Sequence, residues 1–277
     1  MTAEPAALEL DAGPWAERRA RAQELRERQP FANELLTLYL ALLDVQEDAW
    51  SAARESPPDP AELPRWAAAS VLSAVVQATA VAGPAALGEA ARGHLAAGTA
   101  TEALAGWLAG EELAPVERYL ARASLTPVLE ALGDRAGAAC TTPADPIDGS
   151  VCPCCGGPPQ VSYVAATGDS LVSGGRSLLC ARCGSSWSCS RSVCPACGEG
   201  GEARLTTYSE HWGSDAPPLF PHLRVAGCET CRRYLIEVDL ARDARAVPEV
   251  DELTALPLDL HAADQGLTKL TPNLMGF

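Results

Sequence analysis

Four C-x-x-C pairs within 80 residues constrain this chain more than any other feature. The pairs are Cys152/Cys155, Cys180/Cys183, Cys194/Cys197 and Cys228/Cys231. A spacing of two residues lets both sulfurs of a pair reach one tetrahedral ion at about 2.3 Å. Two pairs complete one site, so the eight cysteines predict two four-thiolate metal sites.

The residues that follow each pair also suit metal binding. Gly156, Gly184 and Gly198 come directly after the second cysteine of the first three pairs. Glycine tolerates a positive φ, so the chain can turn back and aim backbone N–H groups at the sulfurs. Arg232 and Arg233 follow the last pair, where they either compensate the excess negative charge of a site or form a solvated surface pair.

The order in which the pairs combine can be argued from the lengths between them. Pairing in chain order leaves 24 residues inside the first site and 30 inside the second, enough in each for a β-hairpin, as in a rubredoxin or zinc ribbon. The alternative joins the two middle pairs across 10 residues and leaves the outer pairs to meet. We favour chain order. Disulfides are a further alternative, disfavoured because we expect a reducing compartment.

Three cysteines remain outside these pairs, and their roles stay open. Cys154 lies between two expected ligands and could replace one of them. Cys189 is the best candidate for a free, reactive thiol, although a small apolar filler is the more common role of such a residue. We expect Cys140 to be inert.

Other side chains near the cysteine pairs could also belong to a metal site. His211 and His222 could each replace a cysteine ligand, although the four thiols already suffice. We expect Trp187 and Tyr208 to pack over the metal sites rather than to bind a ligand.

Charge and hydropathy exclude several classes of protein. The net charge is −15, with −11 on residues 1–150 and −4 on residues 151–277. A divalent ion held by four thiolates adds further negative charge, which disfavours a nucleic-acid-binding zinc ribbon. The first 24 residues lack the pattern of a signal peptide, and no stretch approaches the ~20 apolar residues of a membrane span. We therefore expect a cytoplasmic protein without membrane insertion.

The first half of the sequence reads as an all-α domain, residues 1–140. Apolar residues at helical spacing, with Pro and Gly at the ends, predict helices at 14–29, 31–54, 63–82, 85–97, 101–109 and 113–132. We expect the first of these to be exposed, and Pro127 to kink or break the last. No catalytic motif stands out, so we expect no enzymatic activity.

The second half predicts two small modules, at 141–190 and at 191–277 with the C-terminal tail. Short β-branched and aromatic runs predict strands that begin at Val161, Ser177, Arg204, His222 and Leu235. The expected fold class is therefore α+β, with an N-terminal helical domain followed by two rubredoxin-like or zinc-ribbon modules, each holding four cysteines.

The order of these motifs resembles a known family, the formate dehydrogenase accessory proteins of the FdhE type. The motifs that carry the resemblance are CPCCGGPP at 152–159, LLCARCGSSWSCSRSVCPACG at 178–198, CETCRRYLIEVDL at 228–240, DELTALPLDLHAADQG at 251–266 and the helical region at 21–50. The resemblance covers roughly residues 25–270 and is weakest between 55 and 145. Cys154 and Cys189 are positions that the family pattern does not explain.

The resemblance implies a function. Members of this family are cytoplasmic factors that bind the catalytic subunit of formate dehydrogenase and assist its assembly or activation. The implied ligands are Cys152, Cys155, Cys180 and Cys183 for one ion, and Cys194, Cys197, Cys228 and Cys231 for the other. Iron is the favoured metal and zinc is possible. The alternative is a rubredoxin-like electron-transfer protein with four-thiolate iron centres, because the same ligands suit a redox-active ion.

Overall fold

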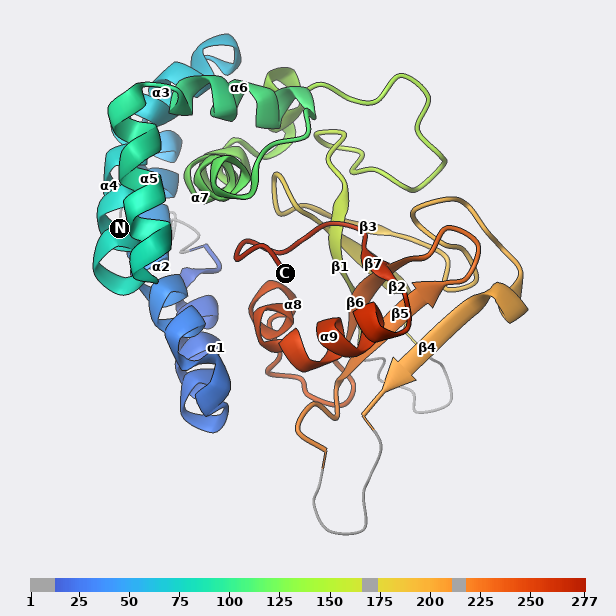
Figure 1. Ribbon diagram of the computed structural model, residues 1–277. Coiled ribbons are helices and arrows are strands. Elements are labelled where there is room, and N and C mark those ends of the chain that lie inside the picture. Colours follow the sequence, from blue (N-terminus) through green and yellow to red (C-terminus); the bar gives the residue numbers. More distant parts are fainter. Residues whose placement is uncertain (1–12, 166–173, 211–217) are drawn as a thin grey trace, which may run out of the picture.

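The computed structural model describes residues 13–165, 174–210 and 218–277, and it joins a helical N-terminal part to a sheet (Figure 1). The C-terminal segment lies between the two parts, where α8 is next to α1. The sheet region carries two groups of four cysteines. The α+β fold class predicted from the sequence is therefore confirmed.

The helical part is built around α2 and α7, which lie against each other; α4 packs against both of them, and α6 packs against α7. Its α-helices are α1 (Trp15–Arg28), α2 (Asn33–Glu55), α3 (Leu63–Ser70), α4 (Leu72–Ala82), α5 (Ala85–Ala97), α6 (Ala100–Ala109) and α7 (Pro115–Leu132). Short 3-10 helices lie at Pro30–Ala32, Pro60–Glu62 and Gly133–Ala139. Leucines such as Leu42, Leu104, Leu120 and Leu129 are fully buried in the shared core.

The single helix expected over residues 63–82 is instead two helices. The axis bends by 43° between Pro60–Ser70 and Leu72–Ala82, and Val71 at the break is buried. Leu72 and Val75 beyond the break are buried as well. The bend thus keeps the apolar side chains of both helices on the core.

We expected Pro127 to kink or break the last helix. The helix does not end there, because α7 continues through Pro127 to Leu132. Proline has no N–H, so the carbonyl of Ala123 four residues earlier loses its helical partner. Gln46 Nε2 on α2 donates to that carbonyl at 3.2 Å. A side chain from the neighbouring helix therefore satisfies the acceptor that Pro127 leaves open.

The expectation that the first helix is exposed is wrong. Trp15, Ala22 and Leu25 of α1 are buried, and they share a core with α2 and with Val250 and Leu253 from the C-terminal segment. Arg21 is also buried, because its charge meets carboxylates from that segment. Arg18 and Arg21 of α1 form ion pairs inside the molecule, whereas Glu17, Glu27 and Arg28 of the same helix are exposed.

The sheet has the strand order β3-β2-β1-β6-β5-β4, and β7 pairs with β6 outside this path. The strands are β1 (Pro159–Val164), β2 (Arg176–Cys180), β3 (Ser186–Ser188), β4 (Leu205–Ser209), β5 (Leu223–Cys228), β6 (Arg233–Asp239) and β7 (Thr268–Lys269). A 3-10 turn at Glu202–Arg204 precedes β4, and the C-terminal segment adds α8 (Pro248–Asp251), a 3-10 turn at Glu252–Thr254 and α9 (Leu256–Asp264). The strands expected from the sequence are thus present, within a few residues of their expected positions.

One pairing joins the strands of the two cysteine groups into a single sheet. β1 and β2 are antiparallel, as are β4, β5 and β6, but β1 pairs with β6 in parallel through Ser162 and Glu237. The two predicted modules thus share a continuous backbone ladder. Their boundaries at 141–190 and 191–277, like that of the helical domain at 1–140, stay a prediction.

Buried polar bonds also tie the helical part to the C-terminal segment. Arg18 of α1 contacts Glu249 at 2.7 Å and Glu130 of α7 at 2.9 Å. Arg122 of α7 donates to the carbonyl of Pro272 at 2.5 Å and also to the Gln160 side chain of β1. Several charged groups from distant parts of the sequence therefore fix how the bundle sits against the sheet.

Among the residues that the structure describes, no single helix has both the length and the hydropathy of a membrane span. One bent pair, Pro60–Ser70 with Leu72–Ala82, reaches the length and hydropathy of a span when its two helices are taken together.

Candidate metal centres

Four sulfurs meet where the first β-hairpin faces the helical bundle. Cys152, Cys155, Cys180 and Cys183 form this group, the first cysteine cluster, in which all ligand atoms lie within 4.8 Å of one another. Cys152 Sγ lies 3.7 Å from Cys183 Sγ. Cys155 Sγ lies 3.4 Å from Cys180 Sγ.

The second cysteine cluster, Cys194, Cys197, Cys228 and Cys231, has the same arrangement. Cys194 Sγ lies 3.8 Å from Cys231 Sγ, and Cys197 Sγ lies 3.8 Å from Cys228 Sγ. The pairing in chain order predicted from the sequence is thus the one found. The alternative that joined the middle pairs is not.

These distances fit a tetrahedral ion. Four sulfurs at about 2.3 Å from one ion in a regular tetrahedron lie about 3.8 Å apart. The measured separations of 3.4–3.8 Å are close to that value and far from the roughly 2.05 Å of a disulfide bond. The donor set therefore suits a closed four-thiolate site, without a coordination position for water.

The same local turn presents the sulfurs at each of the four C-x-x-C pairs. The residue after the second cysteine has φ between 58° and 74° at all four, namely Gly156, Gly184, Gly198 and Arg232. Its N–H bonds the carbonyl of the first cysteine, at 2.8–3.3 Å. Arg232 is the one non-glycine residue with positive φ in the described part of the chain. Glycine at the other three positions avoids the strain that this conformation imposes on a side chain.

Backbone N–H groups in these turns point at the sulfurs, as the glycine pattern suggested. The Arg182 N–H donates to Cys180 Sγ at 3.3 Å. The Ala196 N–H donates to Cys194 Sγ at 3.4 Å. Such bonds stabilise negative charge on sulfur, and thiolate is the form that binds metal.

The two clusters differ in their surroundings. All four cysteines of the first cluster are buried, and they belong to the same core as Leu120, Leu125 and Leu129 of α7. In the second cluster Cys197 and Cys231 are partly exposed. The first cluster is therefore an integral part of the helical core, whereas the second lies nearer the surface.

Cys140, which we expected to be inert, lies beside the first cluster. It packs against the first cluster, and its thiol hydrogen-bonds with Cys155, which raises the pKa of Cys140. The same bond is the largest cause of the lowered pKa of Cys155, which falls to about 4. Hydrogen bonds with Cys152 raise the pKa of Cys180 well above its usual value. A bound cation would displace the protons that these thiols carry.

The other spare thiols are not members of the clusters, although Cys154 packs against the core that contains the first cluster. Cys154 Sγ donates to the Gly133 carbonyl at 3.3 Å, and burial raises its pKa to about 11. Burial also raises the pKa of Cys189, whose thiol donates to the Ser190 carbonyl at 3.7 Å. A raised pKa disfavours the reactive thiolate that was considered for Cys189.

The histidine and aromatic residues considered for the metal sites do not share one location. His222 is buried and its Nε2 lies 2.7 Å from Asp251 Oδ1, so it serves an ion-pair network rather than a cluster. His211 lies outside the described residues. Trp187 packs against the core that contains the first cluster. Tyr208, expected over a metal site, instead packs edge-on to His261 with ring centres 5.5 Å apart.

The two arginines after the last C-x-x-C pair are held differently from each other. Arg232 bonds Glu229 and the Gln265 carbonyl. Arg233 donates to the Lys269 carbonyl at 3.5 Å. Neither contact is to a sulfur.

Comparison with known sequences finds several similar proteins, although no family model matches. The chain is 31% identical over 126 residues to an FdhE homologue of Aquifex aeolicus, covering 46% of this chain and 41% of that protein. It is 35% identical over 124 residues to an FdhE homologue of Pseudomonas putida, covering 45% of this chain and 37% of that one. The matched region thus spans about two fifths of these curated relatives.

Comparison with solved structures extends the likeness to nearly the whole fold. The crystal structure of the FdhE protein from Pseudomonas aeruginosa superposes with a TM-score of 0.68 and covers 94% of both chains, at 24% identity. The arrangement of helical part, sheet and C-terminal segment is therefore one that a solved protein also has.

Proposed function

We propose that the chain is a member of the FdhE family, which it resembles in part of its sequence and in its fold, and that it is a cytoplasmic accessory factor, without enzymatic activity of its own, that binds the catalytic subunit of formate dehydrogenase and assists its assembly or activation. The observation that carries this proposal is that two preformed four-sulfur clusters occur within a fold that matches an FdhE structure over 94% of its length.

Each cysteine cluster, in this proposal, holds one metal ion. The first ion is bound by Cys152, Cys155, Cys180 and Cys183, and the second by Cys194, Cys197, Cys228 and Cys231. The family resemblance favours iron, and zinc suits the same ligands. A closed four-thiolate ion stabilises the turns that ligate it. The support for this is the sulfur geometry, which matches a tetrahedron.

The catalytic subunit, we propose, docks where the helical part meets the sheet part. Phe31, in the 3-10 turn before α2, is 47% exposed and stacks edge-on against Phe220, with ring centres 6.1 Å apart. Leu219, next to Phe220 in the chain, is 42% exposed. Exposed apolar side chains at a junction of two parts often mark a contact surface. Ion pairs of Arg18 with Glu249 and of Arg21 with Asp251 also fix the helical part to the C-terminal segment.

The proposal is tested by capture of the catalytic subunit on the immobilised protein. Cys194→Ala and Cys228→Ala variants should lose the second ion, capture less catalytic subunit and fail to restore formate dehydrogenase activity in a strain that lacks the native factor. The metal content of each variant is measured by elemental analysis. Full capture and full activation by metal-free protein would contradict the proposed role of the metal sites.

A further inference from the structure

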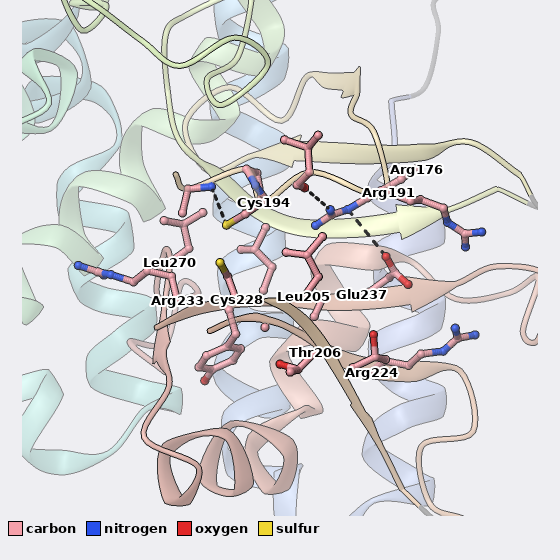
Figure 2. Close-up of a pocket in the computed structure, with 18 residues that line it drawn as sticks. Arg176, Arg191, Cys194, Leu205, Thr206, Arg224, Cys228, Arg233, Glu237 and Leu270 are labelled. Carbon is pink, nitrogen blue, oxygen red and sulfur yellow. Dashed lines mark hydrogen bonds and ion pairs between the residues drawn. The ribbon is translucent and has the colours of Figure 1, made fainter. Parts of the chain in front are cut away.

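A pocket of about 260 Å³ lies beside the second cysteine cluster, on the face of the sheet opposite α9 (Figure 2). Alternate residues of a strand point to opposite faces. Val225 of β5 and Ile236 of β6 face the core that includes Leu258 of α9. Their neighbours Ala226 and Leu235 line the pocket instead. The loop before and through the third C-x-x-C pair, residues 191–196, covers this face.

Positive charge dominates the lining of the pocket, in contrast to the net charge of −15 on the whole chain. Four arginines and one carboxylate, Glu237, contribute to it; the arginines are Arg176, Arg191, Arg224 and Arg233. Within the described residues, no carboxylate lies at ion-pair distance from Arg191 or Arg233, whereas Arg224 pairs with Asp239. The pocket therefore has an excess of cations that the protein itself does not neutralise.

Arg176 is the most unusual of the four, because it is buried and incompletely bonded. Its side chain is 5% exposed, and its Nε makes no hydrogen bond. Another guanidinium nitrogen, Nη1, donates to the Val193 carbonyl at 3.3 Å. The nearest carboxylate oxygen, Glu237 Oε2, lies 3.8 Å from Nε. A buried guanidinium that lacks a close acceptor is costly unless another group supplies one.

Apolar side chains line the rest of the pocket. They are Val193, Pro195, Leu205, Ala226, Leu235 and Leu270. An aromatic or aliphatic body could rest on this surface while a charged group meets the arginines, which is the usual composition of small-molecule sites.

We propose that this pocket binds a small phosphate monoester with an apolar or aromatic body. A phosphate monoester carries close to two negative charges at neutral pH and presents several acceptor oxygens, which guanidinium groups bind through paired hydrogen bonds. Arg191 has no carboxylate partner among the described residues, and Arg176 has Glu237 only at 3.8 Å, so these two guanidiniums leave positive charge in the pocket for a dianion.

The phosphate lies at the end of the pocket formed by Arg176, Arg191 and Arg224. Figure 2 shows Arg191 and Arg224 on the side away from the sulfurs of Cys194 and Cys228. Thiolate charge at the sulfur end would repel a phosphate, so the apolar body lies toward that end. The inference does not depend on the proposed accessory role, because it rests on the lining of the pocket alone.

Isothermal titration calorimetry of the full chain, as purified, with phenyl phosphate tests the proposal. Phenyl phosphate should bind more tightly than inorganic phosphate, because only the ester contacts the apolar lining. Phenol should not bind at the same concentrations. Arg191→Gln should weaken phenyl phosphate binding roughly tenfold, as expected for the loss of a charged hydrogen bond. Arg65→Gln, which removes an exposed arginine of α3, should leave it unchanged.

A second variant tests the position of the site by filling it. Ala226→Leu adds bulk to the pocket without changing charge, and should abolish binding while circular dichroism shows a folded protein. The proposal is overturned if phenyl phosphate does not bind, if inorganic phosphate or phenol binds as tightly, or if folded Arg191→Gln and Ala226→Leu proteins bind it as the wild type does.

Discussion

Arg21 and Asp251, which are 230 residues apart in the chain, form a buried ion pair between α1 and α8, with Arg21 Nε at 3.0 Å and 3.1 Å from the two carboxylate oxygens. Their side chains are 2% and 0% exposed. Asp251 also accepts from the Val247 N–H at 2.8 Å and contacts His222 of the sheet part. One carboxylate thus connects the first helix, the sheet part and the C-terminal segment.

Removal of one member of this pair should destabilise the whole protein. Arg21→Met leaves the buried Asp251 carboxylate without its main cation, and Asp251→Asn leaves the buried Arg21 guanidinium without the negative charge of its partner. Each substitution should lower the free energy of unfolding by about 3–5 kcal/mol. Urea denaturation measures the change. Arg19→Met, which breaks a more exposed pair with Asp44, should cost at most about 1 kcal/mol. If Arg19→Met and Arg21→Met lowered the free energy of unfolding equally, the buried pair would have no greater role in stability than the exposed one.

The bond between Gln46 and the Ala123 carbonyl offers a second test. Gln46→Met should lower the free energy of unfolding by about 1–3 kcal/mol, because the carbonyl that Pro127 leaves open loses its donor. Pro127→Ala restores a backbone N–H to the helix. In the Pro127→Ala background, Gln46→Met should therefore cost clearly less, and a double-mutant cycle by urea denaturation would show it. If the two substitutions changed the free energy of unfolding additively, Gln46 would not be compensating for the N–H that Pro127 lacks.

The glycines around the first cysteine cluster should not tolerate a methyl group, for two different reasons. Gly184 has φ of 70°, so Gly184→Ala should cost about 1–2 kcal/mol through backbone strain. A Cβ on Gly157 would lie 2.9 Å from Cys180 Sγ, so Gly157→Ala should displace a ligand and reduce the metal content toward one ion per chain. Elemental analysis and thermal melts separate the two effects.

Gly93 of α5 is the matched control for these glycine variants. A Cβ there would meet no atom within 4 Å. Because alanine favours a helix more than glycine does, Gly93→Ala should stabilise the protein by about 0.5–1 kcal/mol and leave the metal content unchanged. A similar loss of metal in Gly93→Ala and Gly157→Ala would contradict the proposed contact.

Loss of a ligand should have different consequences in the two clusters. Cys183→Ser and Cys197→Ser should each reduce the metal content by one ion. Cys183 belongs to the core of the helical part, so its variant should also lower the melting temperature followed by helical circular dichroism, by roughly 5–10 °C. Cys197 is partly exposed, and its variant should shift that melt much less. Indistinguishable melts would show that the first ion does not support the helices.

The junction proposed for docking can be probed through Phe31. Phe31→Ser should weaken capture of the formate dehydrogenase catalytic subunit and leave the metal content and the melting temperature nearly unchanged, because the side chain is about half exposed. Val81→Ser is the control, since Val81 is 77% exposed on α4. Undiminished capture by the Phe31 variant would place the docking surface elsewhere.

The local features of this fold could be predicted from the sequence because each depends on neighbouring residues. The spacing of two residues and the following glycine at Gly156, Gly184 and Gly198 determine how each C-x-x-C turn presents its sulfurs. Apolar periodicity likewise indicated the helices that pack around α2 and α7. In these segments the residues that make up the sequence pattern are also the residues that determine the local backbone conformation.

The features that the sequence did not reveal all depend on distant residues. Nothing near Ser162 indicates that β1 pairs in parallel with β6, and nothing near Arg21 indicates that Asp251 neutralises it. Nothing near Cys140 in the sequence indicates that it packs against the first cluster. Gln46 likewise gave no sign that it replaces the donor missing at Pro127. Each of these contacts follows from tertiary packing.

The parallel pairing of β1 with β6 also bears on how the chain folds during synthesis. A ribosome releases the N-terminus first. One edge of β1 then has no pairing partner until β6 has been synthesised. Arg21 has no Asp251 to pair with until still later. An open strand edge invites pairing with other chains. Synthesis of the segment that contains β6 and Asp251 therefore completes the sheet and the buried ion pair, and a nascent chain that stalls before this segment would expose an open strand edge and be prone to aggregate.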